Sequence, residues 1–448
     1  MKRIGTRAKI LVVVFLYVLV CSGVFLFRYV KNAEKWVSHP ANGDVYQNGQ
    51  LKRTGSVLSA DGTVLFSGNG YNKDTELRKA TLHAVGDAAD SINTGVIKTQ
   101  KAALISYNFI DGVYSPTGQG GTVSLTLDAK TQKAAYAALG SSNGTVGIYD
   151  YKTGRILCMV SKPSFDPQRV PDLDKDTYKG VFVNRLTGGV YVPGSVFKLI
   201  TAAAAIENIS DIGERTFTCN KGAEFGGQWV SCPNNHGKVD FDTALAKSCN
   251  AAFGEIAIEL GRDTLDRYAG KAGVGKRFSI DGVQTSKGMI RVDKATKTEL
   301  AWAGIGQYTT LVNPMQYMIF MGAIASGGAA PTPYYIESVK TSYGLPQQIR
   351  VPSPQSLLKK ETADRLKGMM RNNTKTVYGD AQFSGWNLCA KTGTAEVEDG
   401  KPHAWFVGFL DNEETPLAFV VVVEHGGSGS GTALPVAKKA LAAARELY

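Results

Sequence analysis

Histidine is scarce in this chain, with five residues in 448. The five are His39, His83, His236, His403 and His425. Their spacing is typical neither of a metal centre nor of a Ser-His-Asp triad, so a histidine base is not indicated. Internal repeats are also lacking, which argues against a repeat architecture.

Dense clusters of basic residues with interleaved aromatics, which nucleic-acid-binding proteins use, are lacking as well. Lys and Arg number 50 against 39 Asp and Glu, a net charge of +11. Apart from the N-terminus, the basic residues are scattered. We therefore expect no nucleic-acid partner and interpret the charge as a solvated surface or a basic face toward anionic polymer or lipid.

The sequence has only one long hydrophobic run. It comprises the 18 residues 10–27, between Lys9 and Arg28. This length is at the lower limit for crossing a bilayer. A cleaved signal peptide is the alternative, but the run is long for one and no small-x-small cleavage site follows it. We predict a single-pass signal anchor with residues 1–9 in the cytoplasm, because long C-terminal domains are translocated largely regardless of flanking charge.

The chain has only six cysteines, one of which, Cys21, lies in the apolar run. Three others have apolar surroundings typical of buried thiols, namely Cys158, Cys249 and Cys389. Cys219 and Cys232 flank a Gly-rich segment and could form a disulfide outside the membrane. Together with His236 they could instead contribute to a zinc site, although three ligands and this spacing match no standard pattern. Two free thiols are the third possibility.

Three short motifs occur in an order that predicts an active site. They are Ser195-Val196-Phe197-Lys198, Ser248-Cys249-Asn250 and Lys391-Thr392-Gly393-Thr394. The order S-x-x-K, S-x-N, K-T-G is typical of a serine acyl-transfer centre in which a lysine acts as the base.

The context of Ser195 supports its role as the nucleophile. It follows Pro193-Gly194 and opens a run rich in Ala, Ile and Leu, which predicts a helix start at Ser195. Residues three apart share a helix face, so Ser195 and Lys198 can meet. The run is apolar nearly all round and should be buried, which destabilises the ammonium form of Lys198. A second S-x-x-K, at Ser356, lacks this setting and is interpreted as a cap or loop.

Lys391 follows the apolar residues Trp386-Asn387-Leu388-Cys389-Ala390, which predict a short strand. Gly393 would allow a ligand or a backbone to approach closely. An extended peptide could pair with the edge of such a strand.

Several longer stretches resemble class B penicillin-binding proteins. They are GTVGIYDYKTGRILCMVSKPSFDP, GGVYVPGSVFKLITAAAAIEN, LAKSCNAAFGEIAIELG, GIGQYTTLVNPMQ and AKTGTAEVEDGKPHAWFVGF, in this order. The resemblance covers residues 121–448 and extends more weakly toward the apolar run. Val196 stands where the family has Thr, but that side chain faces neighbours and not the chemistry.

The pattern of strands at both ends of the main domain, with helices between, predicts an α+β fold in which helices flank an antiparallel sheet. The resemblance implies the same penicillin-binding, serine β-lactamase-like fold. Residues 115–121 are rich in turn formers and predict a boundary. We expect a cytoplasmic tail (1–9), a transmembrane anchor (10–27), a small mixed linker domain (28–120) and a transpeptidase domain (121–448).

The resemblance implies a D,D-transpeptidase that cross-links peptidoglycan stem peptides and that β-lactams acylate. Ser195 would attack the bond between the terminal D-alanines while Lys198 takes its proton, and Ser248 and Lys391 would relay that proton. Backbone N–H groups of Ser195 and Thr394 would form the oxyanion hole. The substrate would be held by Asn250, Thr392, Gly393 and Thr394. No metal or organic cofactor is expected, and a SEDS-class glycan polymerase in the membrane is the implied partner.

Three alternatives share these motifs. A serine β-lactamase also needs a carboxylate that activates water, and no E-x-x-x-N-like setting is visible. A D,D-carboxypeptidase usually ends in an amphipathic anchor, whereas this chain ends in a core-like helix over residues 434–447. A β-lactam-sensing domain would accompany several membrane spans, and one is predicted here.

Overall fold

The computed structural model describes residues 2–342 and 354–448, except residues 40, 48–49, 52–53, 109–111, 114 and 116–117. Part of the predicted boundary segment, residues 116–117, therefore lies outside the described residues.

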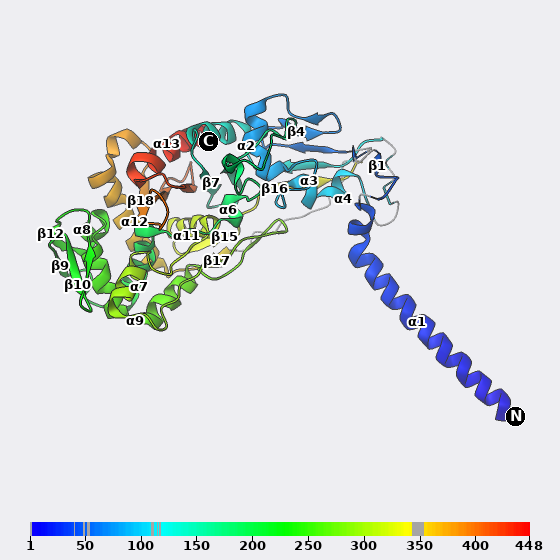
Figure 1. Cartoon of the computed structure of the whole chain (residues 1–448), viewed down its shortest axis with the longest axis horizontal. Helices are drawn as coiled ribbons and strands as arrows, with labels where there is room; N and C mark the ends of the chain where they lie inside the picture. The colour runs from blue at the N-terminus through cyan, green and yellow to red at the C-terminus, as the bar shows by residue number, and fades with distance from the viewer. Residues whose placement is uncertain are drawn as a thin grey trace.

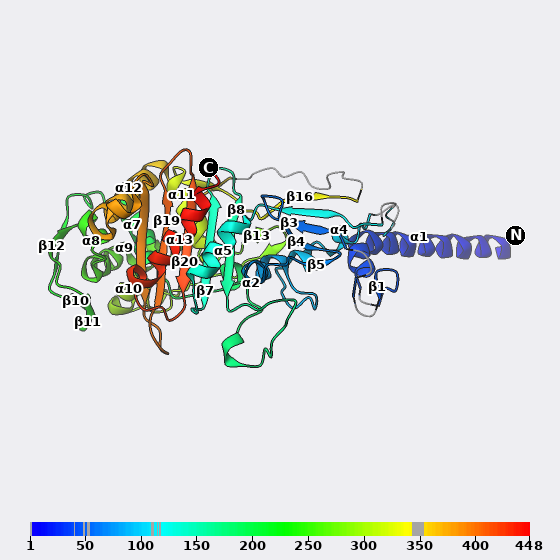
Figure 2. The same ribbon diagram turned by 90° about the horizontal axis from the view of Figure 1, so that it is seen from above.

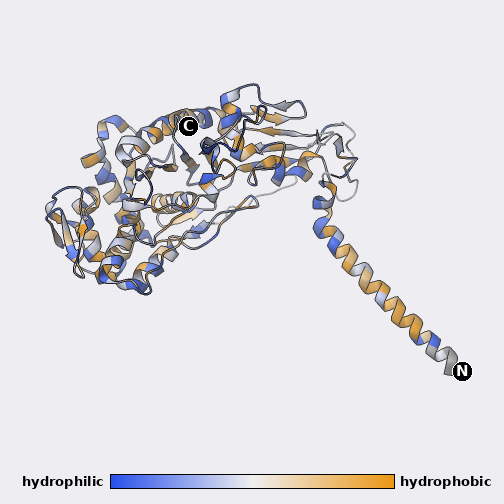
Figure 3. Ribbon diagram, viewed as in Figure 1, coloured by the Kyte–Doolittle hydropathy of each residue, from blue (hydrophilic) through white to orange (hydrophobic). Residues whose placement is uncertain are grey.

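A single long helix, α1 (Lys2–Val37), projects from the body of the protein (Figure 1). Its apolar side chains are exposed; Leu11, for example, has a relative exposure of 68%. Figure 3 shows that hydrophobic residues make up most of the length of this helix. Within the described residues, α1 is the one helix long and apolar enough to cross a membrane.

A mixed five-stranded sheet lies next to α1, with the strand order β16-β6-β3-β4-β5. Its strands are β3 (Ser56–Leu58), β4 (Val64–Ser67), β5 (Gly70–Tyr71), β6 (Thr122–Leu125) and β16 (Ile336–Lys340), and nearby helices are α2 (Thr75–Val85), α3 (Val96–Thr99) and α4 (Lys101–Leu104). β3 pairs with β6 in parallel, and β6 pairs with β16 antiparallel. This sheet thus takes strands from both sides of residue 120, where the sequence predicted a domain boundary.

The central sheet has five antiparallel strands in the order β18-β19-β20-β7-β8 (Figure 2). They are β7 (Gly144–Asp150), β8 (Ile156–Lys162), β18 (Leu388–Ala395), β19 (His403–Leu410) and β20 (Leu417–Val423). Every residue of β7 and β20 is buried, because helices cover both faces. The first and last parts of the domain therefore meet in one sheet, which confirms the predicted α+β fold.

Helices pack on the two faces of this sheet. One face carries α5 (Ala129–Ala138) and α13 (Leu434–Arg445). The other carries the helical part of the domain, formed by α6 (Arg185–Gly188), α7 (Lys198–Asn208), α8 (Phe241–Ala246), α9 (Asn250–Lys271), α10 (Lys297–Gly304), α11 (Pro314–Ala325) and α12 (Lys360–Asn373). Small hairpins, β9 (Thr216–Cys219) with β12 (Gly237–Asp240) and β10 (Gly222–Phe225) with β11 (Gln228–Ser231), lie between α7 and α8.

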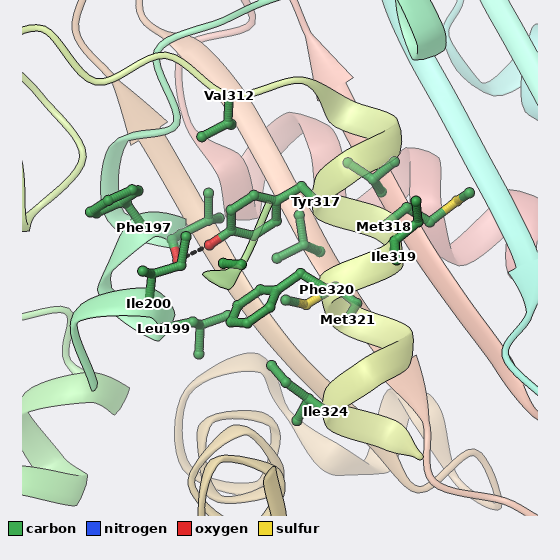
Figure 4. Close-up of a cluster of buried hydrophobic side chains, with 14 of the residues drawn as sticks. Phe197, Leu199, Ile200, Val312, Tyr317, Met318, Ile319, Phe320, Met321 and Ile324 are labelled. Carbon is green, nitrogen blue, oxygen red and sulfur yellow. Dashed lines mark hydrogen bonds between the residues drawn. The ribbon is translucent and has the colours of Figure 1, made fainter. Parts of the chain in front are cut away.

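Helix α11 is buried along its entire length and connects the sheet to α7. Tyr317 on α11 donates a hydrogen bond of 2.6 Å to the backbone oxygen of Val196, and Phe320 packs beside it (Figure 4). Gly322 on the same helix lies against Tyr149 of β7: a Cβ atom added to Gly322 would stand 1.5 Å from the Tyr149 hydroxyl. The distance between α11 and the sheet is therefore set by a glycine.

We predict that Gly322→Ala destabilises the protein by about 1–3 kcal/mol, because a methyl group forced into a packed core displaces side chains and backbone. Thermal unfolding monitored by circular dichroism would report this as a lower Tm.

The matched control is Gly368→Ala on α12, where a new Cβ has no neighbour within 4 Å. Alanine is favoured over glycine in an exposed helix interior by about 0.5–1 kcal/mol, so this variant should have an equal or higher Tm. An unchanged Tm in Gly322→Ala would contradict the close packing of α11 on β7.

Candidate active site

Ser195 lies on a short 3₁₀ turn, Gly194–Phe197, that leads directly into α7. Gly194 has φ of +56°, and a Cβ there would stand 2.5 Å from the backbone oxygen of Thr394. Its N–H donates to the backbone oxygen of Gly306 over 2.9 Å. A residue with a side chain at 194 would push the turn Gly194–Phe197 off β18, so the Pro-Gly pair before Ser195 places this predicted nucleophile against the sheet edge.

Lys198 is completely buried one turn below Ser195. Its Nζ lies 3.1 Å from Ser195 Oγ and 3.0 Å from Ser248 Oγ. It also lies 2.7 Å from both the backbone oxygen of Ser248 and Oδ1 of Asn250. Burial lowers the pKa of Lys198 to about 8, with Cys232 and Cys249 acting in the opposite direction. The amine can therefore accept a proton near neutral pH.

Ser248 occupies the turn between α8 and α9 with φ of +57°, an uncommon backbone conformation for a non-glycine residue. Its Oγ lies 3.0 Å from Lys198 Nζ and 3.1 Å from Lys391 Nζ. Such backbone strain often accompanies functional positions. Here it places one hydroxyl between two amines, an arrangement through which a proton can pass.

Lys391 is also completely buried, on the edge strand β18. Its Nζ donates to the backbone oxygen of Thr392 over 3.0 Å. Burial, followed by the proximity of Lys198, holds the pKa of Lys391 well below its usual value. Two buried lysines that share the Ser248 hydroxyl cannot both be charged at low cost.

The outer edge of β18 is accessible to partners other than β19. The backbone N–H of Thr392 donates to the Tyr378 hydroxyl over 2.9 Å, so this N–H points away from β19. Backbone groups two residues apart on a strand point the same way, which directs the N–H of Thr394 to the same edge, beside Ser195. Gly393 is buried, and a Cβ there would stand 2.8 Å from the backbone oxygen of Pro193. The sequence predicted that a ligand or a backbone approaches Gly393 closely. The group that does so is the backbone of the turn that carries Ser195, residues 193–197, called the nucleophile turn below.

A pocket of about 370 Å³ opens in front of these groups. Five predicted site residues line it, namely Ser195, Ser248, Asn250, Thr392 and Thr394. The sequence analysis missed the other lining residues, which are Ser231, Cys232, Pro233, Trp302, Ile305, Gln307 and Glu396. Ile305 and Gln307 belong to the GIGQYTT stretch, which was a usable signal. No sequence signal pointed to Tyr378, which contacts Thr392, because it comes from the π-helical turn Thr374–Tyr378, which is not part of any of the three motifs.

The second S-x-x-K is not part of the site. Ser356 ends the short strand β17 (Pro354–Ser356), which pairs with β15 (Ala329–Pro331). Lys359 Nζ lies 3.7 Å from a carboxylate oxygen of Glu207. Ser356 therefore lies outside the active-site pocket, although it is a strand residue and not the cap or loop residue that the sequence predicted.

All six cysteines lie within the described residues, and all are free thiols. The disulfide considered for Cys219 and Cys232 is not formed. Instead Cys219 Sγ lies 3.5 Å from His236 Nδ1, and Cys232 Sγ lies 4.0 Å from Cys249 Sγ. Cys249, which the sequence analysis did not connect with Cys219 and Cys232, therefore lies in one cluster with them.

Known proteins match this fold and site. Residues 144–442 match the penicillin binding protein transpeptidase domain. The chain is 28% identical over 454 residues to the peptidoglycan D,D-transpeptidase PbpA of Mycolicibacterium smegmatis, with 89% of each chain covered. The D,D-transpeptidase domain of a peptidoglycan glycosyltransferase from Eggerthella lenta has a TM-score of 0.74 at 27% identity, covering 88% of this chain and 98% of that one. A ceftriaxone acyl-enzyme complex of penicillin-binding protein A from M. tuberculosis shares the fold, with a TM-score of 0.76, 23% identity and the same coverage.

The chain therefore belongs to the penicillin-binding protein transpeptidase family. Within that family it is a serine acyltransferase of the peptidoglycan D,D-transpeptidase kind, similar to PbpA over most of its length.

We predict that Lys198→Ala slows acylation by a fluorescent penicillin about 100-fold or more, because it removes the predicted base beside Ser195. In the wild-type protein, the acylation rate should fall as the pH drops below about 8, since protonated Lys198 cannot accept a proton. The measurement is the second-order rate of labelling across pH, with circular dichroism to confirm that the variant is folded.

Ser356→Ala serves as the control because it removes the serine of the second S-x-x-K. This variant should label at the wild-type rate. If both variants lost the same fraction of the acylation rate, or if Lys198→Ala kept the wild-type rate, the assignment of the base to the first S-x-x-K would be wrong.

Proposed function

We propose that Ser195 is the nucleophile of this transpeptidase and that Lys198 is its base. Ser195 Oγ attacks the carbonyl carbon between the terminal D-alanines of a stem peptide. The new ester forms while the bond to the last D-alanine breaks. The proton leaves Oγ for Lys198 and reaches the departing amine through Ser248 and Lys391. The contacts of 3.0–3.1 Å among these groups are the observation that carries the proposal.

The acyl group then passes to an amine of a second stem peptide. That amine forms the new amide bond, the ester to Ser195 breaks, and the proton that the amine loses returns to Ser195 Oγ. Each step moves an acyl group or a proton, so a metal or organic cofactor has no part in it. We assign the oxyanion hole to the backbone N–H groups of Ser195 and Thr394, which the outward direction of Thr394 on β18 supports.

Substrate binding is assigned to the remaining motif residues. Asn250 uses Oδ1 for Lys198 and one hydrogen of Nδ2 for the backbone oxygen of Ser231 over 2.7 Å. Its second Nδ2 hydrogen is available for a substrate carbonyl. We assign the terminal carboxylate chiefly to the hydroxyl of Thr394, an exposed residue, because the Thr392 hydroxyl lies 3.2 Å from that of Tyr378. Gly393 contributes by holding this strand against the nucleophile turn.

The test of this proposal is an exchange assay. The full-length enzyme in detergent is given a stem pentapeptide and a labelled amine acceptor, and mass spectrometry follows D-alanine release and the labelled product. We expect labelled product and D-alanine in about equal amounts, because acyl transfer consumes one acceptor for each D-alanine released.

Ser195→Ala is the control and should give neither product. Release of D-alanine without labelled product would identify a carboxypeptidase. Rapid turnover of penicillin, in place of a stable adduct on Ser195, would identify a β-lactamase. Either result would overturn the proposal.

We propose that residues 10–27 anchor the protein in the cell membrane, with residues 1–9 in the cytoplasm and the catalytic domain outside. Residues 28–120 would form the linker domain and residues 121–448 the transpeptidase domain, with β6 and β16 joining the two. The exposed apolar surface of α1 supports the anchor. A crevice where α1 meets the linker region, lined by Val30, Glu34 and Tyr107 among others, would then lie close to the membrane.

We further propose a SEDS-class glycan polymerase as the membrane partner, in contact with the anchor and the linker domain. Among solved structures with this fold, a penicillin-binding protein PBP2 from Helicobacter pylori is in complex with MreC. Polymerisation of glycan and cross-linking of its peptides act on the same product, which favours a joint complex.

Replacing residues 10–27 with an unrelated apolar span of equal length should reduce the amount of polymerase that co-purifies from membranes. Quantitative mass spectrometry of the purified complex would measure the reduction. Ser195→Ala should co-purify the wild-type amount, since it leaves the contact surface intact. If the protein with the replaced span co-purified the wild-type amount of polymerase, the anchor would not be part of the contact with the polymerase.

A further inference from the structure

Four metal-binding side chains cluster behind the S-x-N motif. The Sγ atoms of Cys219, Cys232 and Cys249 and a ring nitrogen of His236 lie within 4.8 Å of one another. The pairs Cys219–His236 and Cys232–Cys249 are separated by 3.5 Å and 4.0 Å. In a tetrahedral zinc site with Zn–S bonds of about 2.3 Å, ligand atoms lie about 3.7 Å apart. The cluster thus has nearly the spacing that one zinc ion requires.

The four ligands come from four separate segments of the chain. Cys219 ends β9, Cys232 follows β11, His236 precedes β12, and Cys249 caps the start of α9. Figure 1 shows β9, β10, β12 and α8 at the end of the molecule opposite α1. Apart from the cysteines, few side chains of these strands are buried, namely Phe217, Val230 and Val239. These three side chains pack into the core that also contains α9, so a bound metal would add a direct link between the hairpins and the start of that helix.

Backbone N–H groups at the start of α9 point at two of the sulfurs. The N–H of Asn250 donates to Cys232 Sγ over 2.9 Å, and the N–H of Ala252 donates to Cys249 Sγ over 3.5 Å. Helix N-termini stabilise thiolates, which are the form of cysteine that binds a metal. His236 is only half-buried and Cys232 lines the active-site pocket, so an ion can enter from the surface.

We propose that Cys219, Cys232, His236 and Cys249 bind one structural zinc ion, which fixes the start of α9 and thereby Asn250 beside Lys198. Three Cys and one His form a closed coordination shell, as structural zinc sites have. Binding displaces the thiol protons to solvent, and the neutral imidazole donates its lone pair. A disulfide would need two sulfurs at about 2.05 Å and would leave the third thiol and His236 without a role.

The metal content of the full-length protein tests the proposal. The protein is purified in detergent with a phosphine reductant, incubated with zinc sulfate and desalted before elemental analysis. We expect about one zinc ion per chain, because one closed tetrahedral shell holds one ion. Cobalt in place of zinc should give the visible absorption of a tetrahedral cobalt–thiolate site. A strong chelator should lower both the Tm and the rate of acylation by penicillin.

Cys219→Ala should bind zinc at least about tenfold more weakly, since it removes a ligand. Cys158→Ala is the matched control, because Cys158 is a buried cysteine on β8 outside the cluster, and it should keep its zinc. His236→Ala also removes a ligand, but at a half-buried position, so it tests the same site if Cys219→Ala does not fold. In His236→Ala, the chelator should leave the Tm nearly unchanged.

Failure to retain zinc in the reduced wild-type protein would overturn the proposal. So would equal zinc contents in wild type, Cys219→Ala and His236→Ala. An acylation rate that does not respond to zinc removal would overturn the link to Asn250. Zinc content does not depend on acylation, so Ser195→Ala should bind zinc normally even if the proposed catalytic roles are wrong.

Discussion

The burial of the Lys198 amine is the constraint on which the site depends. Removing an ammonium from water is costly, and the cost is reduced when the group loses its proton and when oxygen atoms surround it. Three separate segments supply those oxygens: the nucleophile turn, the turn at Ser248 and the first residue of α9. The left-handed backbone at Ser248 is one consequence, because that turn must present both its carbonyl and its hydroxyl to the same amine. A second is the neighbouring burial of Lys391, whose amine completes the contacts of the Ser248 hydroxyl.

This arrangement requires a rigid support, which the central sheet provides. β18 is its edge strand, so one side of that strand pairs with β19 while the other meets the nucleophile turn and the pocket. On the helical side, α11 connects the sheet to the turn before α7 through the hydrogen bond from Tyr317 to the backbone oxygen of Val196, the residue next to Ser195 (Figure 4). The functional groups are therefore carried by strands and helix ends with few alternative conformations, which keeps the distances between them fixed.

Local patterns in the sequence predicted much of this. The three motifs contain the residues that the fold brings together around Lys198, and the final helix, expected over residues 434–447, spans Leu434–Arg445. Contacts between distant segments were not predictable in the same way. Neither the approach of Tyr378 to Thr392 nor the joining of Cys249 to Cys219 follows from spacing, because each depends on how separate elements pack. The mixed sheet that takes strands from both sides of residue 120 is a third example, since a turn-rich segment is compatible with a boundary and equally with a loop inside one sheet.

The turn Ser248-Cys249-Asn250 connects the catalytic groups to the small hairpins behind them. Ser248 and Asn250 direct polar atoms to Lys198, whereas Cys249 between them directs its sulfur toward Cys232. The N–H of Asn250 also donates to Cys232, so the same residue contacts the base with its side chain and the cysteine cluster with its backbone. Any change in the separation of those sulfurs must therefore move the start of α9. Because Asn250 Oδ1 and the Ser248 carbonyl are two of the acceptors that make the burial of Lys198 tolerable, such a movement alters the environment of the proposed base itself. The position of the cysteine cluster thus gives the hairpins, which carry none of the proposed catalytic residues, a physical route to the reaction centre.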